Sequence, residues 1–576
     1  MASISVRKLV QNLTSIFASK PGQNMASIFM RKPVSHVQDD FKKSELKRTL
    51  GPFNLVTLGI GCIIGAGIFV LTGHAAATMA GPAVIFAFII SGLACAFAGL
   101  CYAELASTMP VSGSAYSYSY VTLGEVFAWT MGWLLLLEYG IAASTVAAGW
   151  TGYVVSLAHD FGIFIPDFVS HSTMQYIVPN PNNPAAHGAL QVTGAVNVVG
   201  ALGILFVTSL LVVGVKESAN VNNVIVVTKV SVLLAFIVIG YTYINPANWH
   251  PFIPPNEGSF HYGWPGILRA ASYVFFAYIG FEAVSTAAGE AKNPQKDLPI
   301  GILGSLVICT IIYMAVSAVL TGVVPFRTLN VPDPIAVAVD RMNPAWAIVA
   351  WPLTESHKLN LFSFIIKIGA FTGLTSVMLV LCYAQTRVFY QMAKDGLIAR
   401  IFSRVNKTFH TPAAGTILLG AIIALAAAVL PLDVMGNLVS LGTALAFAIV
   451  CISVIYLRRA EPDLARPFKV PFYPWTPILG AFFCIVLMIG PILLDITGAA
   501  IGKDLIGMLF ASLSSPPAGT PVPTYNAPHD PIALYILVAY AVIGAVLYTV
   551  YGYRHSKLRE GILVQGHEPP PLDLPQ

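Results

Sequence analysis

Charged residues are scarce in this sequence. Only 10% of its 576 residues are Asp, Glu, Lys or Arg, while 56% are apolar, and an ordinary soluble domain has about 25% charged residues. So few charges cannot cover the surface of a water-soluble fold. Twelve apolar runs of roughly 20 residues or more fill the chain instead, and each can cross a hydrocarbon core about 30 Å thick as a helix. The composition predicts an all-α polytopic membrane protein.

The sequence also lacks the patterns of metal sites, disulfide frameworks and enzymes. Its seven cysteines all fall within apolar runs, with no CxxC pair, so we expect neither a disulfide nor zinc. It has no phosphate loop, nucleophile triad or His/Glu metal pattern. We therefore expect no enzyme activity, cofactor or metal ion. The net charge of +5 reports membrane topology rather than a nucleic-acid partner, and no obligate protein partner is inferred.

The apolar runs are bounded by glycine, proline and charged residues. They cover residues 53–77, 82–107, 125–158, 193–214, 219–243, 264–289, 299–325, 359–395, 413–431, 433–457, 475–495 and 531–553. An even number of transmembrane helices places both termini on the same side of the membrane.

Basic residues fix which side that is. If both termini are cytoplasmic, the outside loops carry only four of them, and the outside loops 159–192 and 244–263 carry none. The four are Arg327, Arg341, Lys358 and Lys503. The positive-inside rule therefore predicts cytoplasmic termini. We expect a multi-pass protein of the plasma membrane, which is the inner membrane in a bacterium.

The two ends of the chain are polar. Residues 1–52 lack the apolar core of a signal peptide, and the letters MASI occur both at Met1 and at Met25. Either Met25 is the true start, or this cytoplasmic segment forms a basic amphipathic helix on the inner leaflet. The cytoplasmic tail 554–576 ends in PPPLDLPQ, a composition that predicts disorder.

Glycines interrupt two of the apolar runs near their middle. The first run reads GIGCIIGAGIFVLTG over 59–73, and the sixth reads FFAYIGFEAVSTAAGE over 275–290. Because these runs lie five spans apart, the spacing favours two inverted repeats of five helices, 53–243 and 264–457, with discontinuous helices 1 and 6. Two extra helices follow over 475–553. The alternative interpretation is that the glycines only allow close helix packing.

Unwound backbone in mid-membrane offers free N–H and C=O groups to a ligand. The N–H groups can hold a carboxylate, and the carbonyls can hold an ammonium group. The predicted substrate site comprises Ile64, Gly65, Ala66 and Gly67 of the first interruption and Phe276, Ala277, Tyr278 and Ile279 of the second. The first group would bind a carboxylate and the second an ammonium group.

Longer motifs around these residues resemble a known family. They read LKRTLGPFNLVTLGIGCIIGAGIFVLTG (46–73), CYAELASTMPVSGSAYSY (101–118), LEYGIAASTVAAGW (137–150), NNVIVVTKVSVLL (222–234), FFAYIGFEAVSTAAGEAKNPQKDLPIGI (275–302) and AQTRVFYQMAKDGL (384–397). They resemble the amino acid-polyamine-organocation superfamily, and within it the cationic amino acid transporter family with its bacterial members. The resemblance implies alternating access around a site between helices 1 and 6. Gly289, Glu282 and Arg269 depart from the family pattern.

Lys229 is the eleventh residue of its apolar run, roughly 15 Å along the helix from either membrane surface. One interpretation is a purely structural lysine bonded to carbonyls. The other is an amine that loads and releases a proton during the transport cycle. The resemblance implies a proton-linked lysine at this position, beside the first interruption.

Five further residues are candidates for the site or its gates. Thr375 and Ser376 could together bind a sodium ion, although hydroxyls in membrane helices more often bond to nearby backbone; we expect Thr375 to line the substrate pocket. Glu104, Glu138 and Glu282 are intramembrane acids, and such residues are functional candidates by default. Glu104 could equally lie at the interface, whereas we expect Glu282 at the inner gate.

Arg269 bears on the substrate. It lies about eight residues before the second interruption, so it either points to the headgroups or lines the outer vestibule. In the vestibule it would repel dibasic substrates, which leaves small neutral amino acids as open a possibility as arginine or lysine.

The sequence thus predicts a proton-coupled symporter of L-amino acids whose partners are the amino acid, the proton and the lipid bilayer. The alternative is an amino acid exchanger without net proton coupling. A sensor that does not transport is less favoured, because the terminal segments are too short for an extra domain.

Overall fold

The computed structural model of the chain describes residues 29–33, 50–111, 113–177, 189–214, 219–257, 260–350, 358–409, 411–497 and 532–559. The predicted amphipathic helix and most of the predicted disordered tail lie outside these residues.

The described chain is mostly helical. Its α-helices are α4 (Pro52–Ile63), α5 (Thr72–Ala75), α6 (Val84–Thr108), α7 (Ser114–Thr122), α8 (Glu125–Leu135), α9 (Ala142–Asp160), α10 (Asp167–Ser170), α11 (Val198–Val213), α12 (Ala219–Tyr241), α13 (Gly263–Val274), α14 (Pro294–Val323), α15 (Pro334–Met342), α16 (Leu361–Lys394), α17 (Ala413–Val429), α18 (Leu432–Ala460), α19 (Trp475–Thr497), α21 (Ile532–Leu547) and α22 (Tyr553–His555).

Short helices of other geometry join or interrupt these. The π-helices are η1 (Gly67–Leu71), η2 (Ala76–Ala80), η4 (Leu136–Ile141) and η11 (Tyr548–Gly552). The 3₁₀-helices are η3 (Gly81–Ala83), η5 (Pro246–Trp249), η6 (Phe275–Tyr278), η7 (Glu282–Glu290), η8 (Phe326–Thr328), η9 (Ala345–Ala347) and η10 (Arg400–Phe402).

Two small β-ribbons depart from the all-α expectation. Strand β1 (Met174–Ile177) pairs antiparallel with β2 (Ala189–Val192), and β3 (Ile348–Ala350) pairs with β4 (Lys358–Asn360). Both ribbons lie in connections between long helices, where pairing satisfies backbone groups that no helix satisfies. The long helices still define the fold.

The prediction of a helical membrane protein is confirmed. Eight helical stretches of the described chain are long and apolar enough to cross a membrane. They are Pro52–Thr108, Glu125–Asp160, Asn223–Tyr241, Gly263–Ala288, Pro294–Val323, Leu361–Lys394, Leu432–Ala460 and Tyr535–His555. Three shorter apolar helices accompany them: Val198–Val213, Ala413–Val429 and Trp475–Met488.

The first stretch, Pro52–Thr108, has 57 residues, about 85 Å of helix if it were straight. It turns at Gly81, whose φ of +62° is a conformation that glycine adopts most readily. The stretch therefore contains both of the first two predicted spans.

Helices α4 and α13 are too short to cross a membrane alone. Each has 12 residues, or about 18 Å, against a hydrocarbon core of about 30 Å. Each therefore ends partway along its candidate span, where the chain continues in a different geometry.

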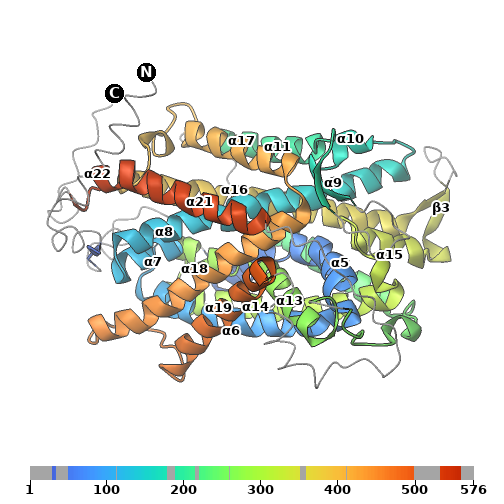
Figure 1. Cartoon of the computed structure of the whole chain (residues 1–576), viewed down its shortest axis with the longest axis horizontal. Helices are drawn as coiled ribbons and strands as arrows, with labels where there is room; N and C mark the ends of the chain where they lie inside the picture. The colour runs from blue at the N-terminus through green and yellow to red at the C-terminus, as the bar shows by residue number, and fades with distance from the viewer. Residues whose placement is uncertain are drawn as a thin grey trace.

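The long helices form one bundle around these two short ones. Helix α14 packs against α6 and α4, α16 against α9 and α12, and α18 against α19. Helices α7 and α22 lie at one end of the bundle, and α10, α15 and β3 at the other (Figure 1). We call these the α7 end and the α15 end. All seven cysteines are buried in the bundle.

Candidate functional site

The first interruption follows α4. The helix ends at Ile63, Ile64 leaves the helical region with φ −71° and ψ 97°, and π-helix η1 starts at Gly67. The first N–H groups of a new helix have no acceptor within that helix. The chain from Gly65 to Gly67 therefore presents amide donors partway along this stretch.

The second interruption follows α13. One 3₁₀ turn, η6, leads to Ile279 in extended geometry (φ −57°, ψ 133°) and to Gly280 at φ +118°. Side chains disfavour that positive φ, which explains the glycine. The chain resumes as η7 at Glu282, whose carboxylate accepts the Gly280 N–H at 2.9 Å and so holds the turn between the two helices.

The two interruptions touch each other through their glycines. A Cβ placed on Gly67 would lie 2.3 Å from the Ala277 Cα, and one on Gly280 would lie 2.7 Å from the carbonyl carbon of Cys62. No side chain fits at either position without moving backbone. These glycines serve the contact between the two interruptions.

Lys229 of α12 reaches the end of α4. Its ammonium group donates to the Gly61 carbonyl at 2.9 Å and to the Ile64 carbonyl at 3.3 Å, and the side chain is 1% exposed. The last carbonyls of a helix lack intrahelical donors and form the negative end of its dipole. A cation at this point is therefore stabilised where the first helix is broken.

Tyr313 of α14 joins the two interruptions. Its buried hydroxyl lies 2.7 Å from the Ile63 carbonyl and 2.9 Å from the Ala277 carbonyl. One hydroxyl proton serves two acceptors, so movement of either interruption changes this contact. Tyr313 was not among the predicted site residues, and its one signal in the sequence is a tyrosine within an apolar run.

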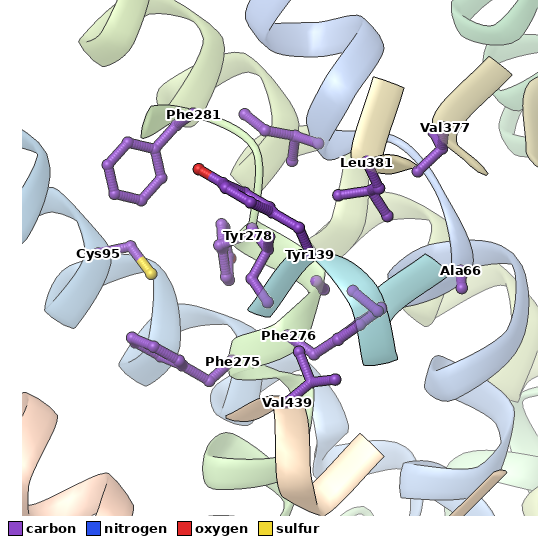
Figure 2. Close-up of a cluster of buried hydrophobic side chains, with 14 of the residues drawn as sticks. Ala66, Cys95, Tyr139, Phe275, Phe276, Tyr278, Phe281, Val377, Leu381 and Val439 are labelled. Atoms are coloured by element: carbon purple, nitrogen blue, oxygen red, sulfur yellow. The ribbon is translucent and has the colours of Figure 1, made fainter. Parts of the chain in front are cut away.

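Apolar side chains from several helices surround the interruptions. Figure 2 shows Ala66 with Phe276 and Tyr278 of η6, Val377 and Leu381 of α16, Tyr139 of η4 and Val439 of α18 in one cluster. All are 5% exposed or less. A ligand bound in this region would therefore contact the polar backbone groups of the two interruptions and the apolar side chains that surround them.

Two of the predicted acids meet beside this cluster. Glu138 lies in η4 next to Glu282, and both are fully buried. The Glu138 carboxyl group and the Tyr139 hydroxyl both lie within hydrogen-bonding reach of the Glu282 carboxylate. Two buried carboxyl groups side by side cannot both be charged without a large cost, so this pair is suited to hold a proton. The π-helix η4 that carries Glu138 was not predicted from the sequence, and this geometry is often found at functional sites.

Glu104 lies apart from the interruptions. Its carboxylate pairs with Arg458 at 2.5 Å and with Arg466 at 3.6 Å, and it accepts the Val470 N–H at 2.7 Å. It joins α6 to α18 and to the segment after α18. These arginines therefore have a packing role beside any role in topology.

Thr375 hydrogen-bonds to a side chain of α9 and to its own helix. Its hydroxyl accepts the Trp150 indole N–H at 2.9 Å and donates to the Phe371 carbonyl, so it faces α9. Ser376 donates to the Gly373 carbonyl of its own helix. Val377 is the α16 residue at the first interruption, because a Cβ on Gly65 would lie 3.1 Å from its side chain.

We expect Val377→Met to narrow the range of transported substrates toward smaller side chains, because the longer side chain would fill space at the first interruption. The matched control Thr375→Met changes the same helix on its α9 face and should leave the range nearly unchanged. Uptake of a panel of labelled amino acids by cells expressing each variant measures both. A changed range for Thr375→Met alone would contradict this assignment.

A charged cluster at the α15 end was also missed. The Lys367 ammonium of α16 is 1% exposed and pairs with Asp160 of α9 at 2.8 Å and with Asp340 of α15 at 3.0 Å. Asp333, at the start of α15, adds a third carboxylate. Burial, followed by the nearby Asp340, raises the pKa of Asp333 to about 6, although Lys367 lowers it.

This pKa predicts how α15 responds to pH. A carboxyl whose pKa is about 6 in the fold and near 3.9 in the unfolded chain opposes folding at neutral pH, and that opposition fades as pH falls through 6. Protection of α15 amides from hydrogen exchange, corrected for intrinsic rates, should therefore rise from pH 7.5 to pH 5. The rise should shrink in Asp333→Asn and remain in Asp167→Asn, which changes an exposed residue of α10. An unchanged rise in Asp333→Asn would contradict the prediction.

Apolar helices with two touching interruptions at mid-span are the architecture of secondary membrane transporters. The chain belongs to the amino acid permease family, whose model matches residues 50–512. This confirms the resemblance drawn from the motifs, and the family is one of transporters rather than enzymes.

The relatives of this chain are named for different substrates. The chain is 44% identical to the methylthioribose transporter of Bacillus subtilis (strain 168), over 78% of this chain and 89% of that protein. It is 40% identical to the branched-chain amino acid permease BcaP of the same organism, over 90% and 96%. It is 37% identical to the vacuolar cationic amino acid transporter 4 of Arabidopsis thaliana, over 73% and 64%.

Proposed function

We propose that this protein is a proton-coupled symporter of neutral, apolar L-amino acids. The observation that carries the proposal is the meeting of two helix interruptions with a buried lysine at one of them. The backbone groups at this junction can bind a zwitterion, and the lysine beside them can carry a proton.

The substrate backbone binds between the interruptions. Amides of Gly65, Ala66 and Gly67, with Ile64 beside them, bind the carboxylate because they begin a new helix. Carbonyls of Phe276, Ala277 and Tyr278, with Ile279 beside them, bind the ammonium group. The Tyr313 hydroxyl donates to the Ala277 carbonyl in the structure. When substrate binds, its ammonium group replaces the hydroxyl as the donor to this carbonyl.

The substrate side chain is neutral and apolar. Phe276, Val377, Leu381 and Val439 surround the interruptions, and apolar walls favour an apolar ligand. Arg269, whose guanidinium lies 3.4 Å from His261, would disfavour cationic substrates on their way in. The substrates named for the two Bacillus relatives, methylthioribose and branched-chain amino acids, carry no charged side chain, which agrees with this proposal.

Lys229 carries the proton. Protonated, it holds the carbonyl end of α4 as the structure describes; neutral, it binds these carbonyls less strongly and lets the first helix move. Glu138 and Glu282 act on the pathway between this site and the cytoplasm, where η7 contacts α7.

The chain crosses the membrane twelve times in this proposal. Splitting Pro52–Thr108 at Gly81 and counting the three shorter apolar helices gives that number. Residues 53–243 and 264–457 form two inverted repeats, 475–553 adds two helices, and 1–52 and 554–576 are cytoplasmic. The α7 end then faces the cytoplasm and the α15 end faces outward, in the plasma membrane.

Substrate analogues test the binding mode. L-Leucine should compete with labelled L-leucine, whereas isoamylamine, which lacks the carboxylate, and N-acetyl-L-leucine, which lacks the ammonium group, should not. Equal competition by either analogue would show that the interruptions do not hold these groups.

A further inference from the structure

His74 lies at the centre of a polar cluster at the α15 end. It belongs to α5, which continues the first interrupted helix, and it is 6% exposed. Its Nδ1 lies 2.7 Å from the Asn330 side-chain oxygen, and its Nε2 lies 3.2 Å from an Asp433 carboxylate oxygen. One imidazole therefore connects α5 to the segment before α15 and to the first turn of α18.

Both ring nitrogens of His74 face oxygen atoms. A neutral imidazole has one N–H group and can donate to only one of these oxygens, whereas an imidazolium donates to both. The Thr78 hydroxyl near Nε2 already donates to the His74 carbonyl. A protonated His74 can therefore donate hydrogen bonds to both Asn330 and Asp433.

Several titratable and charged groups surround His74, and one of them, Asp333, also changes charge near pH 6. From α13, Tyr273 packs against its ring, and Arg269 approaches His261 in the segment before that helix. Burial and the Arg269 charge lower the pKa of His261 to about 3, so His261 stays neutral at physiological pH. Helix α15 meets α5 through Pro334 at Gly73, while its Asp333 and Asp340 gather at Lys367. Histidine is the side chain that changes charge most readily between about pH 5 and 8.

We propose that His74 is a second proton-binding site, separate from Lys229, which when protonated latches α5 to Asp433 of α18 and to Asn330. The position of this latch on the outer face of the membrane rests on the proposed function, in which the α15 end faces outward. External acid then holds α5 against α18, next to the interruption that binds substrate. The ligand of this site is a proton taken from the outside solution.

Hydrogen exchange of the full chain in lipid nanodiscs tests this latch at pH 5.5 and 7.5, with rates corrected for intrinsic exchange. Residues 67–80 should be at least about 5-fold better protected at pH 5.5, the lower end of usual coupling between sites. His74→Gln and Asp433→Asn should each remove that difference, while Thr78→Val should retain it. A difference that persists in His74→Gln, or is absent in the unmodified chain, overturns the proposal.

The same measurement in Lys229→Met separates the latch from proton-coupled transport. The His74-dependent difference should persist there, because the two sites are distinct. If transport proves independent of protons while this difference remains, the proposed function fails and the latch stands. Loss of the difference in Lys229→Met would show that Lys229 is its source and would overturn the proposal.

Discussion

Lys229→Met should bind substrate yet fail to accumulate it. The ammonium group holds the Gly61 and Ile64 carbonyls at the end of α4, and methionine fills similar space without a proton to exchange. Proton and substrate are coupled only if both stabilise the same conformation. Without the amine, the inside-to-outside ratio of substrate should fall to about one, and the pH dependence of substrate affinity should flatten.

Two assays on the purified variant measure these effects. Thermal-shift titration with L-leucine from pH 5.5 to 8 reports affinity, and proteoliposomes report accumulation. Lys407→Met removes an exposed lysine between η10 and α17 and should behave as the unmodified protein. Native accumulation and a native pH profile in Lys229→Met would exclude this lysine as the proton carrier.

Gly67→Ala should reduce transport about 100-fold. The new methyl group would lie 2.3 Å from the Ala277 Cα, so the two interruptions must separate. A displacement of about 1 Å at a site that depends on geometry costs on the order of a hundredfold in rate. The added methyl group pushes the two interruptions apart, and both bind the substrate in the proposal. Substrate affinity should therefore fall together with transport.

Gly99→Ala is the matched control for this variant. It lies on α6, where the nearest side-chain atom would be 3.6 Å from the new methyl group, an ordinary contact. Size-exclusion chromatography and thermal unfolding show whether each variant is folded. A folded Gly67→Ala with native uptake would show that the two backbones need not touch for transport.

The class of fold could be predicted from the sequence because membrane-spanning helices are recognised by their composition. Long apolar runs with few charges predict membrane helices, and the glycines at 65, 67 and 280 marked where two helices stop. The run 53–77 looked like one span, and the structure divides it into α4, η1, α5 and η2. Such geometry depends on what each residue contacts, which a run of apolar letters does not encode.

Tertiary partners were beyond the reach of sequence patterns. Thr375 was predicted to line the pocket, and its hydrogen bond with Trp150 of α9 is a contact that no sequence pattern indicates. Val377, Tyr313 and His74 gained their importance from neighbours more than 35 residues away in sequence, such as Ala277 and Asn330. Lys229 could be singled out because a charge in mid-membrane needs a partner whatever the fold.

Uptake of labelled L-leucine by proteoliposomes of the unmodified protein tests the central claim most directly. A pH gradient, acid outside, is imposed while the membrane potential is clamped to zero. The substrate should accumulate above its external concentration, and a protonophore should abolish this accumulation. Uptake that only equilibrates, or that needs internal amino acid and ignores the pH gradient, would contradict proton-coupled symport and indicate facilitated diffusion or exchange.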